Sequence, residues 1–281
     1  IHGEDLWRTD GTEAGTTLVR DISTASGGTF ISLWGVFGGK VYFTARHSPH
    51  GTELWNTDGT EAGTVMLTDL NPGLAESNPT FLAVFRGALY FAATDGVHGH
   101  ELWRTDGTEA GTAMVKDINP GSAGSSAGSP YVVESAGVLY FPADDGTHGS
   151  ELWRTDGTEA GTYLVSDISP GPESSDPEWL ADLGGVLVFG APDPAHGRAL
   201  WRSDGTDAGT ELVKDISQNP TSFGPLGMTE VQGTIYFQAN DDVHGAELWK
   251  TDGTEAGTGL VEDIYPGEYG SNPNYFLDLN G

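Results

Sequence analysis

The sequence predicts an all-β fold, a six-bladed β-propeller of four-stranded antiparallel blades, on three observations. A tryptophan recurs at gaps of 48, 48, 50, 48 and 48 residues, at Trp7, Trp55, Trp103, Trp153, Trp201 and Trp249. Periods of about 40–50 residues are typical of propeller blades. Short apolar segments bounded by Gly, Asp and Asn, without a helical period, indicate strands throughout. We therefore expect a single domain over residues 1–281, with repeats starting near residues 2, 50, 98, 148, 196 and 244.

Each period contains four segments that favour strands. In the repeat around Trp103 these segments are residues 81–85, 88–93, 101–105 and 112–118. An antiparallel order places the turn before each tryptophan strand on the same face as the loop that follows each repeat. These loops vary in sequence while the strands repeat, and they are residues 23–28, 71–79, 119–130, 169–177, 217–225 and 265–273. Variable loops on a repeated scaffold are the usual place for specificity.

The two ends of the chain are expected to share one blade. Five tryptophans follow an aromatic strand, whose phenylalanines are Phe43, Phe91, Phe141, Phe189 and Phe237, whereas Trp7 follows none. We expect the strands around Trp7 and Val19 to complete the blade begun by residues 274–279, since closure removes exposed sheet edges. That blade lacks one strand in this arrangement, and self-association through the incomplete blade is an expected consequence.

The composition excludes several classes of partner and site. The chain has 41 acidic and 12 basic residues, a net charge of −29, which disfavours nucleic acid as a partner. No apolar run reaches the length needed for membrane insertion. Without cysteine there are no disulfides, thiolate zinc sites or cysteine nucleophiles. No catalytic motif occurs either, so the protein is not expected to be an enzyme. No cofactor is indicated, although the acidic loops leave calcium open as a ligand.

The repeated residues favour structural roles. Each tryptophan and the leucine before it are expected to pack between neighbouring blades, with sugar stacking as the alternative. An aspartate-glycine pair follows each tryptophan strand, and we expect it to form a structural turn. Trp179 lies outside the repeated pattern, and we expect it to take part in surface recognition.

A histidine precedes each tryptophan by five residues, which gives the set His2, His50, His98, His148, His196 and His244. One interpretation is that each histidine stabilises the turn in which it lies by hydrogen bonding to the backbone. The other is that the histidines contribute to equivalent ligand pockets or a pH-sensitive surface. Nearby acids are then predicted to ligate a cation or a hydroxyl, and they are Asp95, Asp145, Asp193 and Asp241. His47 replaces the acid in the repeat of His50.

The run E-L-W-R-T-D-G-T-E-A-G-T is present without change at residues 101–112 and 151–162. It resembles the bacterial family named for its E-L-W-x-x-D-G-T repeat, and the resemblance covers the whole chain. Asp5 and Ala199 depart from the motif glutamate, and Asn56 departs from the basic residue. The resemblance implies an extracellular or cell-surface protein of a bacterium and transfers no activity or site residue.

Three classes of function follow from these observations. The first is a non-enzymatic binding or adhesion propeller that recognises a glycan or protein ligand through its variable-loop face. The alternatives are a structural or assembly module of a larger surface protein and an enzyme that uses the central funnel.

Overall fold

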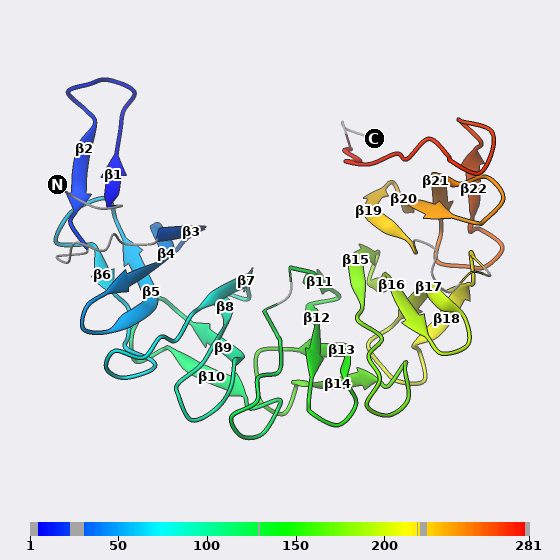
Figure 1. Ribbon diagram of the computed structural model, residues 1–281. Helices are drawn as coiled ribbons and strands as arrows, with labels where there is room; N and C mark the ends of the chain where they lie inside the picture. The colour runs from blue at the N-terminus through cyan, green and yellow to red at the C-terminus, as the bar shows by residue number, and fades with distance from the viewer. Residues whose placement is uncertain (1–4, 23–30, 129, 218, 220–223, 279–281) are drawn as a thin grey trace. The chain divides into compact units, whose positions relative to one another are not determined.

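The chain folds into a series of small antiparallel sheets in the computed structural model (Figure 1). The structure describes residues 5–22, 31–128, 130–217, 219 and 224–278. The chain divides into two compact units, unit 1 (Ile1–Gly128) and unit 2 (Ser129–Gly281). Among the described residues, no helix has the length and apolar character required to cross a membrane.

Unit 1 contains a two-stranded sheet followed by two four-stranded sheets in the described part of the chain. The first sheet consists of β1 (Leu6–Arg8) and β2 (Thr17–Arg20). The second consists of β3 (Ile31–Phe37), β4 (Lys40–His47), β5 (Gly51–Thr57) and β6 (Val65–Met66). The third consists of β7 (Thr80–Phe85), β8 (Ala88–Ala93), β9 (Glu101–Thr105) and β10 (Ala113–Lys116).

Unit 2 contains three four-stranded sheets among its described residues. The first consists of β11 (Val133–Ser135), β12 (Val138–Asp144), β13 (Ser150–Thr155) and β14 (Tyr163–Ser166). The next consists of β15 (Glu178–Leu183), β16 (Val186–Asp193), β17 (Gly197–Ser203) and β18 (Glu211–Lys214). The last consists of β19 (Leu226–Val231), β20 (Thr234–Asn240), β21 (Ala246–Thr251) and β22 (Gly259–Glu262). Neighbouring strands in every sheet are consecutive in the chain, which confirms the predicted repeat of four antiparallel strands.

The spacing of aromatic residues sets the register of each four-stranded sheet. The phenylalanine of the second strand lies directly opposite the tryptophan of the third, as in Phe91 and Trp103. The other pairs are Phe43 with Trp55, Phe141 with Trp153, Phe189 with Trp201, and Phe237 with Trp249. Because side chains alternate along a strand, this register turns both aromatic rings to the same face of the sheet.

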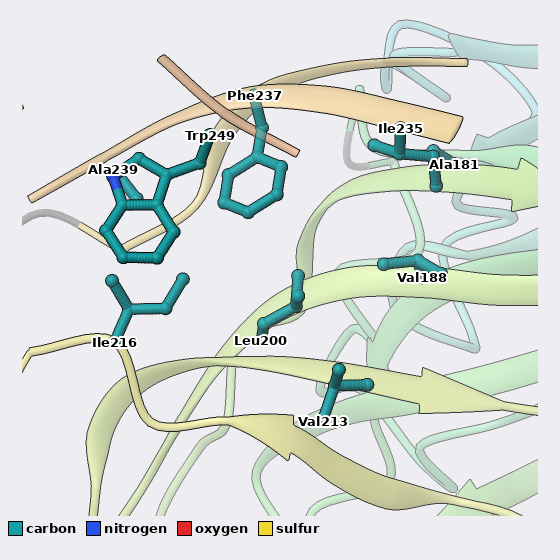
Figure 2. Close-up of a cluster of buried hydrophobic side chains, with 9 residues drawn as sticks. All are labelled: Ala181, Val188, Leu200, Val213, Ile216, Ile235, Phe237, Ala239 and Trp249. Carbon is teal, nitrogen blue, oxygen red and sulfur yellow. The ribbon is translucent and has the colours of Figure 1, made fainter. Parts of the chain in front are cut away.

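Successive sheets within each unit pack through these aromatic faces. Figure 2 shows Leu200 of one sheet in the same buried cluster as Phe237 and Trp249 of the next. In unit 1, Leu54 is buried with Phe91 and Trp103 in the same way. The predicted packing of the leucine-tryptophan pair between sheets is thus confirmed within both units.

Two tryptophans depart from this packing. Trp201 is only half-buried, and Trp7 is 54% exposed whereas Trp103 is 8% exposed. The expectation that all six tryptophans are buried is therefore wrong for Trp7. The reason is local, because β1 pairs only with β2 in the described residues and no strand lies beside it as β8 lies beside β9.

An arginine after the tryptophan ties one sheet to the next. Arg154 Nη1 donates to the carbonyl of Gly205 at 3.2 Å, and Arg202 Nη1 donates to the carbonyl of Gly253 at 3.0 Å. The backbone at Gly205 has a φ of +86°, and a Cβ there would lie 2.2 Å from Tyr140 Oη. Glycine is therefore required for conformation and for this close approach.

The aspartate-glycine turn is confirmed as structural. Asp156 Oδ1 accepts hydrogen bonds from the amide of Thr158 at 2.9 Å and from its hydroxyl at 2.7 Å. Equivalent bonds form at Asp10, Asp58, Asp106, Asp204 and Asp252. The carboxylate occupies the side of the turn where a Cβ at Gly161 would lie, since that atom would be 2.0 Å away.

Replacing Trp103 with alanine is expected to lower the free energy of unfolding by ~3–5 kcal/mol, the range for deleting a large buried aromatic side chain. Trp7→Ala serves as the control, because an exposed side chain should cost less than about 1 kcal/mol. Urea denaturation of both variants measures the difference. Equal losses would contradict the assigned role of the buried tryptophans.

Candidate functional site

A glutamate of the repeat, not singled out from the sequence, holds the variable loops in place. Glu151 is fully buried, and its Oε1 accepts the amides of Ser169 and Ser175 at 3.3 and 3.0 Å. Its Oε2 accepts the Ile168 amide at 3.1 Å and the Ser175 hydroxyl at 2.5 Å. Both ends of the loop are thereby anchored to one side chain.

The same anchor recurs at Glu53, Glu101 and Glu247. Burial raises the pKa of Glu53 and of Glu151 to about 7, because desolvation disfavours the charged carboxylate. The sequence did contain a signal for this role, since a serine follows each of these glutamates by the same number of residues.

One of the two repeats that lack this glutamate anchors its loop differently. Ala199 stands in its place, and Asp242 from the turn between β20 and β21 supplies the carboxylate. Asp242 Oδ2 accepts the Ser217 hydroxyl at 2.5 Å and the Asn219 amide at 3.1 Å. The departure at residue 199 therefore changes which sheet holds the loop.

Four described histidines of the repeat are bound within their own turns. Nδ1 of His98 lies 2.8 Å from Asp95 Oδ2, and the same aspartate accepts the amides of Val97 and His98. The pairs His148–Asp145, His196–Asp193 and His244–Asp241 have the same geometry. The hydrogen bond to the aspartate raises the pKa of each of these four histidines. This geometry favours the turn-locking interpretation.

His50 differs from these four. Residue 47 is a histidine, so His50 Nδ1 pairs instead with Asp69 Oδ2 at 2.7 Å, and the two imidazole rings stack at 5.7 Å. Burial lowers the pKa of His47, which disfavours a charged imidazolium beside His50. His2 lies outside the described residues.

The aspartates of the metal prediction are the partners of these histidines. Among the described residues, no group of three or more His, Cys, Asp or Glu side chains is arranged to hold a metal ion. One further set of acidic oxygens is buried without a hydrogen-bond partner in the described structure, the Oδ1 atoms of Asp69, Asp117, Asp167 and Asp263. A calcium site stays a prediction.

Trp179 lies at a distorted point of strand β15. The register of β15 against β16 shifts between Glu178 and Ala181, which is a β-bulge, and Trp179 has a φ of +55°. Its indole lies 5.4 Å from the ring of Tyr131 at an interplanar angle of 55°. Trp179 also lines a pocket of about 450 Å³ formed with strand β19 and residues 273–276. The structure therefore places this predicted recognition residue at a pocket.

The pocket arises where one repeat lacks an aromatic side chain. Gly227 precedes Trp249 by the same number of residues as Trp179 precedes Trp201, and both residues have a positive φ. Tyr275 occupies the equivalent position in the segment that follows the last sheet, after an Asn-Pro pair. Tyr275 is 95% exposed and has a φ of +56°. A Cβ at Gly227 would lie 3.5 Å from the ring of Phe276, so a larger side chain there would fill the pocket.

The remaining lining combines apolar surface with uncharged polar groups. Leu226, Met228, Pro273 and Phe276 supply apolar atoms, and the polar side chains are Thr229, Gln238 and Asn274. Sequence reasoning missed these residues because they lie on three different segments. Aligning the repeats by the distance to the following tryptophan would have found the aromatic position itself, occupied by Phe81, Tyr131 and Trp179. Tyr275 follows Trp249 by the same number of residues as Phe81 follows Trp55.

No family model matches the chain, and no curated protein matches it. The chain is similar to the crystal structure of a serine-to-alanine mutant of puromycin hydrolase complexed with PGG. The two chains are 14% identical with a TM-score of 0.52, and the match covers 93% of this chain and 41% of that chain. It is also similar to puromycin hydrolase, with 16% identity and a TM-score of 0.51, and this match covers 92% of this chain and 41% of that chain. A prolyl endopeptidase matches with 13% identity and a TM-score of 0.51, and this match covers 82% of this chain and 34% of that chain.

The chain thus spans less than half the length of each of these enzymes. At such identities the likeness shows the fold alone, an all-β, propeller-like arrangement of antiparallel sheets.

We expect the pKa of His148 to lie above the ordinary value of a histidine because of its hydrogen bond to Asp145. Asp145→Asn should lower that pKa, because the variant removes the negative partner. The stability that this pair contributes is present below the unfolded pKa and is lost as the pH rises through the folded one. Proton NMR titration of the imidazole resonances measures the change. His196 is the internal control and should titrate unchanged. A His148 pKa unaffected by the substitution would contradict the pairing.

Proposed function

We propose that the protein is a non-enzymatic extracellular binding propeller that recognises a glycan through the pocket at Trp179. The observation that carries the proposal is the presence in one pocket of two exposed aromatic rings and three uncharged polar side chains, Thr229, Gln238 and Asn274. Aromatic faces cover the apolar faces of a sugar ring, while amide and hydroxyl groups both donate to and accept from its hydroxyls. A pocket of this composition fits a saccharide better than a charged ligand.

The conformation of Trp179 supports a role in binding. A positive φ raises the conformational energy of a bulky residue by about 1–3 kcal/mol, and residues strained in this way are found most often at ligand sites and active sites. Tyr131 contacts the indole, and the neighbouring Glu178 is paired with Arg198 at 2.7 Å. The Tyr131 contact limits the motion of the indole before a ligand arrives, and the ion pair holds the adjacent residue, which reduces the entropy cost of binding.

The pocket chemistry also supports a function without catalysis. The residues that line it include no carboxylate, histidine, lysine or cysteine. Those are the groups that general acid–base and nucleophilic catalysis most often use, and no described contact of Thr229 or Tyr275 pairs either of them with an activating base. The peptidase activities named for the similar structures belong to those proteins. The extracellular or cell-surface location rests on the resemblance of the repeats.

We also propose that the sheets form one closed propeller of six blades, whose last blade combines strands from both ends of the chain. The support is the regular series of sheets and the exposure of Trp7 in the two-stranded sheet, which an additional strand would cover. An assembly function is the second candidate, because a strand from another molecule would cover Trp7 equally.

Small-angle X-ray scattering tests closure. A compact chain of this length is expected to have a radius of gyration of about 19 Å. A clearly larger radius at low concentration would indicate an open array and contradict closure. A radius and mass that rise together with concentration would instead support assembly.

Trp179→Ala is expected to weaken glycan binding about tenfold or more, because an aromatic contact contributes about 0.5–1.5 kcal/mol beyond the area that it buries. The probes are the β-1,4-glucan, β-1,4-mannan, α-1,4-glucan and β-1,4-xylan hexasaccharides, first screened for binding and then titrated by calorimetry.

The matched control is Tyr269→Ala, which removes an exposed aromatic side chain outside the pocket. Thermal melts of both variants should match that of the unmodified protein. Absence of binding to all four probes, or equal losses in the two variants, would overturn the proposal. Binding to a protein ligand that depends on Trp179 would place recognition in the same pocket but reject a glycan as its ligand.

A further inference from the structure

Unit 1 has a pocket at the same place in the repeat as the pocket of Trp179. Its volume is about 620 Å³, and it is lined by parts of strands β3 and β4, Thr52, Glu76 and residues 78–81. Leu33 and Gly227 each precede the tryptophan of their own repeat, Trp55 or Trp249, by the same number of residues. The same is true of Thr44 and Gln238. Phe81 follows an Asn-Pro pair as Tyr275 does. The two pockets are therefore equivalent positions of the repeated sheet, formed from different side chains.

Aromatic and apolar surface lines one part of this second pocket. Phe81 is 37% exposed, close to the value of Trp179. The Trp34 ring lies 5.9 Å from the ring of Phe81 and 6.0 Å from that of buried Phe91, so Trp34 is held against the core while it lines the pocket. Phe81 and Trp34 thus supply the rigid apolar surface that a sugar ring requires.

A charged pair and several hydroxyl groups line the rest. Arg46 Nε lies 3.4 Å from Glu76 Oε1, with side chains 65% and 35% exposed. An exposed ion pair of this kind adds little stability. Arg46 carries five N–H donors and Glu76 only acceptors, so the pair can bind two adjacent hydroxyl groups of one ring. Four residues that carry hydroxyl groups, Ser32, Thr44, Thr52 and Thr80, line the same pocket.

We infer that unit 1 contains a second saccharide-binding site, in which Phe81 and Trp34 contact the sugar face while Arg46 and Glu76 bind vicinal hydroxyls. The inference rests on the proposed function for the class of ligand, but it assigns a different site with different residues. The Trp179 pocket has no charged side chain in its lining, so the two sites bind hydroxyl groups with different chemistry. Two sites on one chain raise the avidity for a polysaccharide without a new contact.

The test follows the two sites separately in one protein. Indole N–H resonances of Trp34 and Trp179 are assigned by Trp34→Phe and Trp179→Phe substitution. Cellobiose, mannobiose, maltose and xylobiose are then titrated into the full chain. Both resonances are expected to shift with at least one disaccharide. Arg46→Ala should raise the Kd read from Trp34 about tenfold or more, since it removes charged hydrogen-bond donors, and leave the Kd read from Trp179 unchanged.

Arg86→Ala is the matched control, because Arg86 is an exposed arginine of the same unit that does not line the pocket. It should change neither Kd. If Trp179 shifts and Trp34 does not, the second site is rejected while the proposed function stands. If Trp34 shifts equally in the Arg46→Ala variant, the assignment of Arg46 is overturned. If neither resonance shifts with any disaccharide, the second site and saccharide binding at the Trp179 pocket are both rejected.

Discussion

The rest of the structure depends on the burial of leucine, phenylalanine and tryptophan between successive sheets. A four-stranded sheet of this size cannot bury its apolar face alone, so each sheet uses its neighbour as the other half of its core. In unit 2, Leu200 is buried with Phe237 and Trp249, and the equivalent set in unit 1 begins at Leu54. Because the same residues return in each period, one kind of interface serves the whole of each unit. Trp7 is exposed in the two-stranded sheet, where no further strand lies beside β1 in the described residues.

The buried glutamates connect this core to the surface that varies. Glu151 is placed in the third strand by the same register that buries Trp153, and it binds the amides at both ends of the following loop. The rest of the loop can then change in sequence without losing its attachment, because the carboxylate meets backbone amides and one recurring serine hydroxyl. Where Ala199 replaces the glutamate, Asp242 from another sheet supplies the carboxylate, so the attachment is retained although its residue changes.

Both candidate sites lie where the repeats differ from one another. The core positions are nearly identical in every sheet and therefore offer no basis for distinguishing ligands. At the bulged position of the first strand, the chain has Trp179 in one repeat and Gly227 in the next, and this difference forms a pocket. The equivalent place in unit 1 has Leu33 and gains Arg46 from the adjacent strand. Function on such a scaffold comes from departures from the repeat, since symmetry gives every sheet the same core.

By itself, the sequence determined the strands, the order of four per repeat, the packing role of the leucine-tryptophan pair and the structural role of the aspartate turn. These features depend on spacing along the chain, and periodicity reports spacing directly. The tertiary structure alone decided how Glu151 reaches the loop that ends at Ser175, and which residues join Trp179 in a pocket. Those contacts link residues from different strands and sheets, so their formation depends on register, on bulges and on which side chain is missing. A pattern read along one chain does not contain that information, because proximity between segments is created only when the sheets pack.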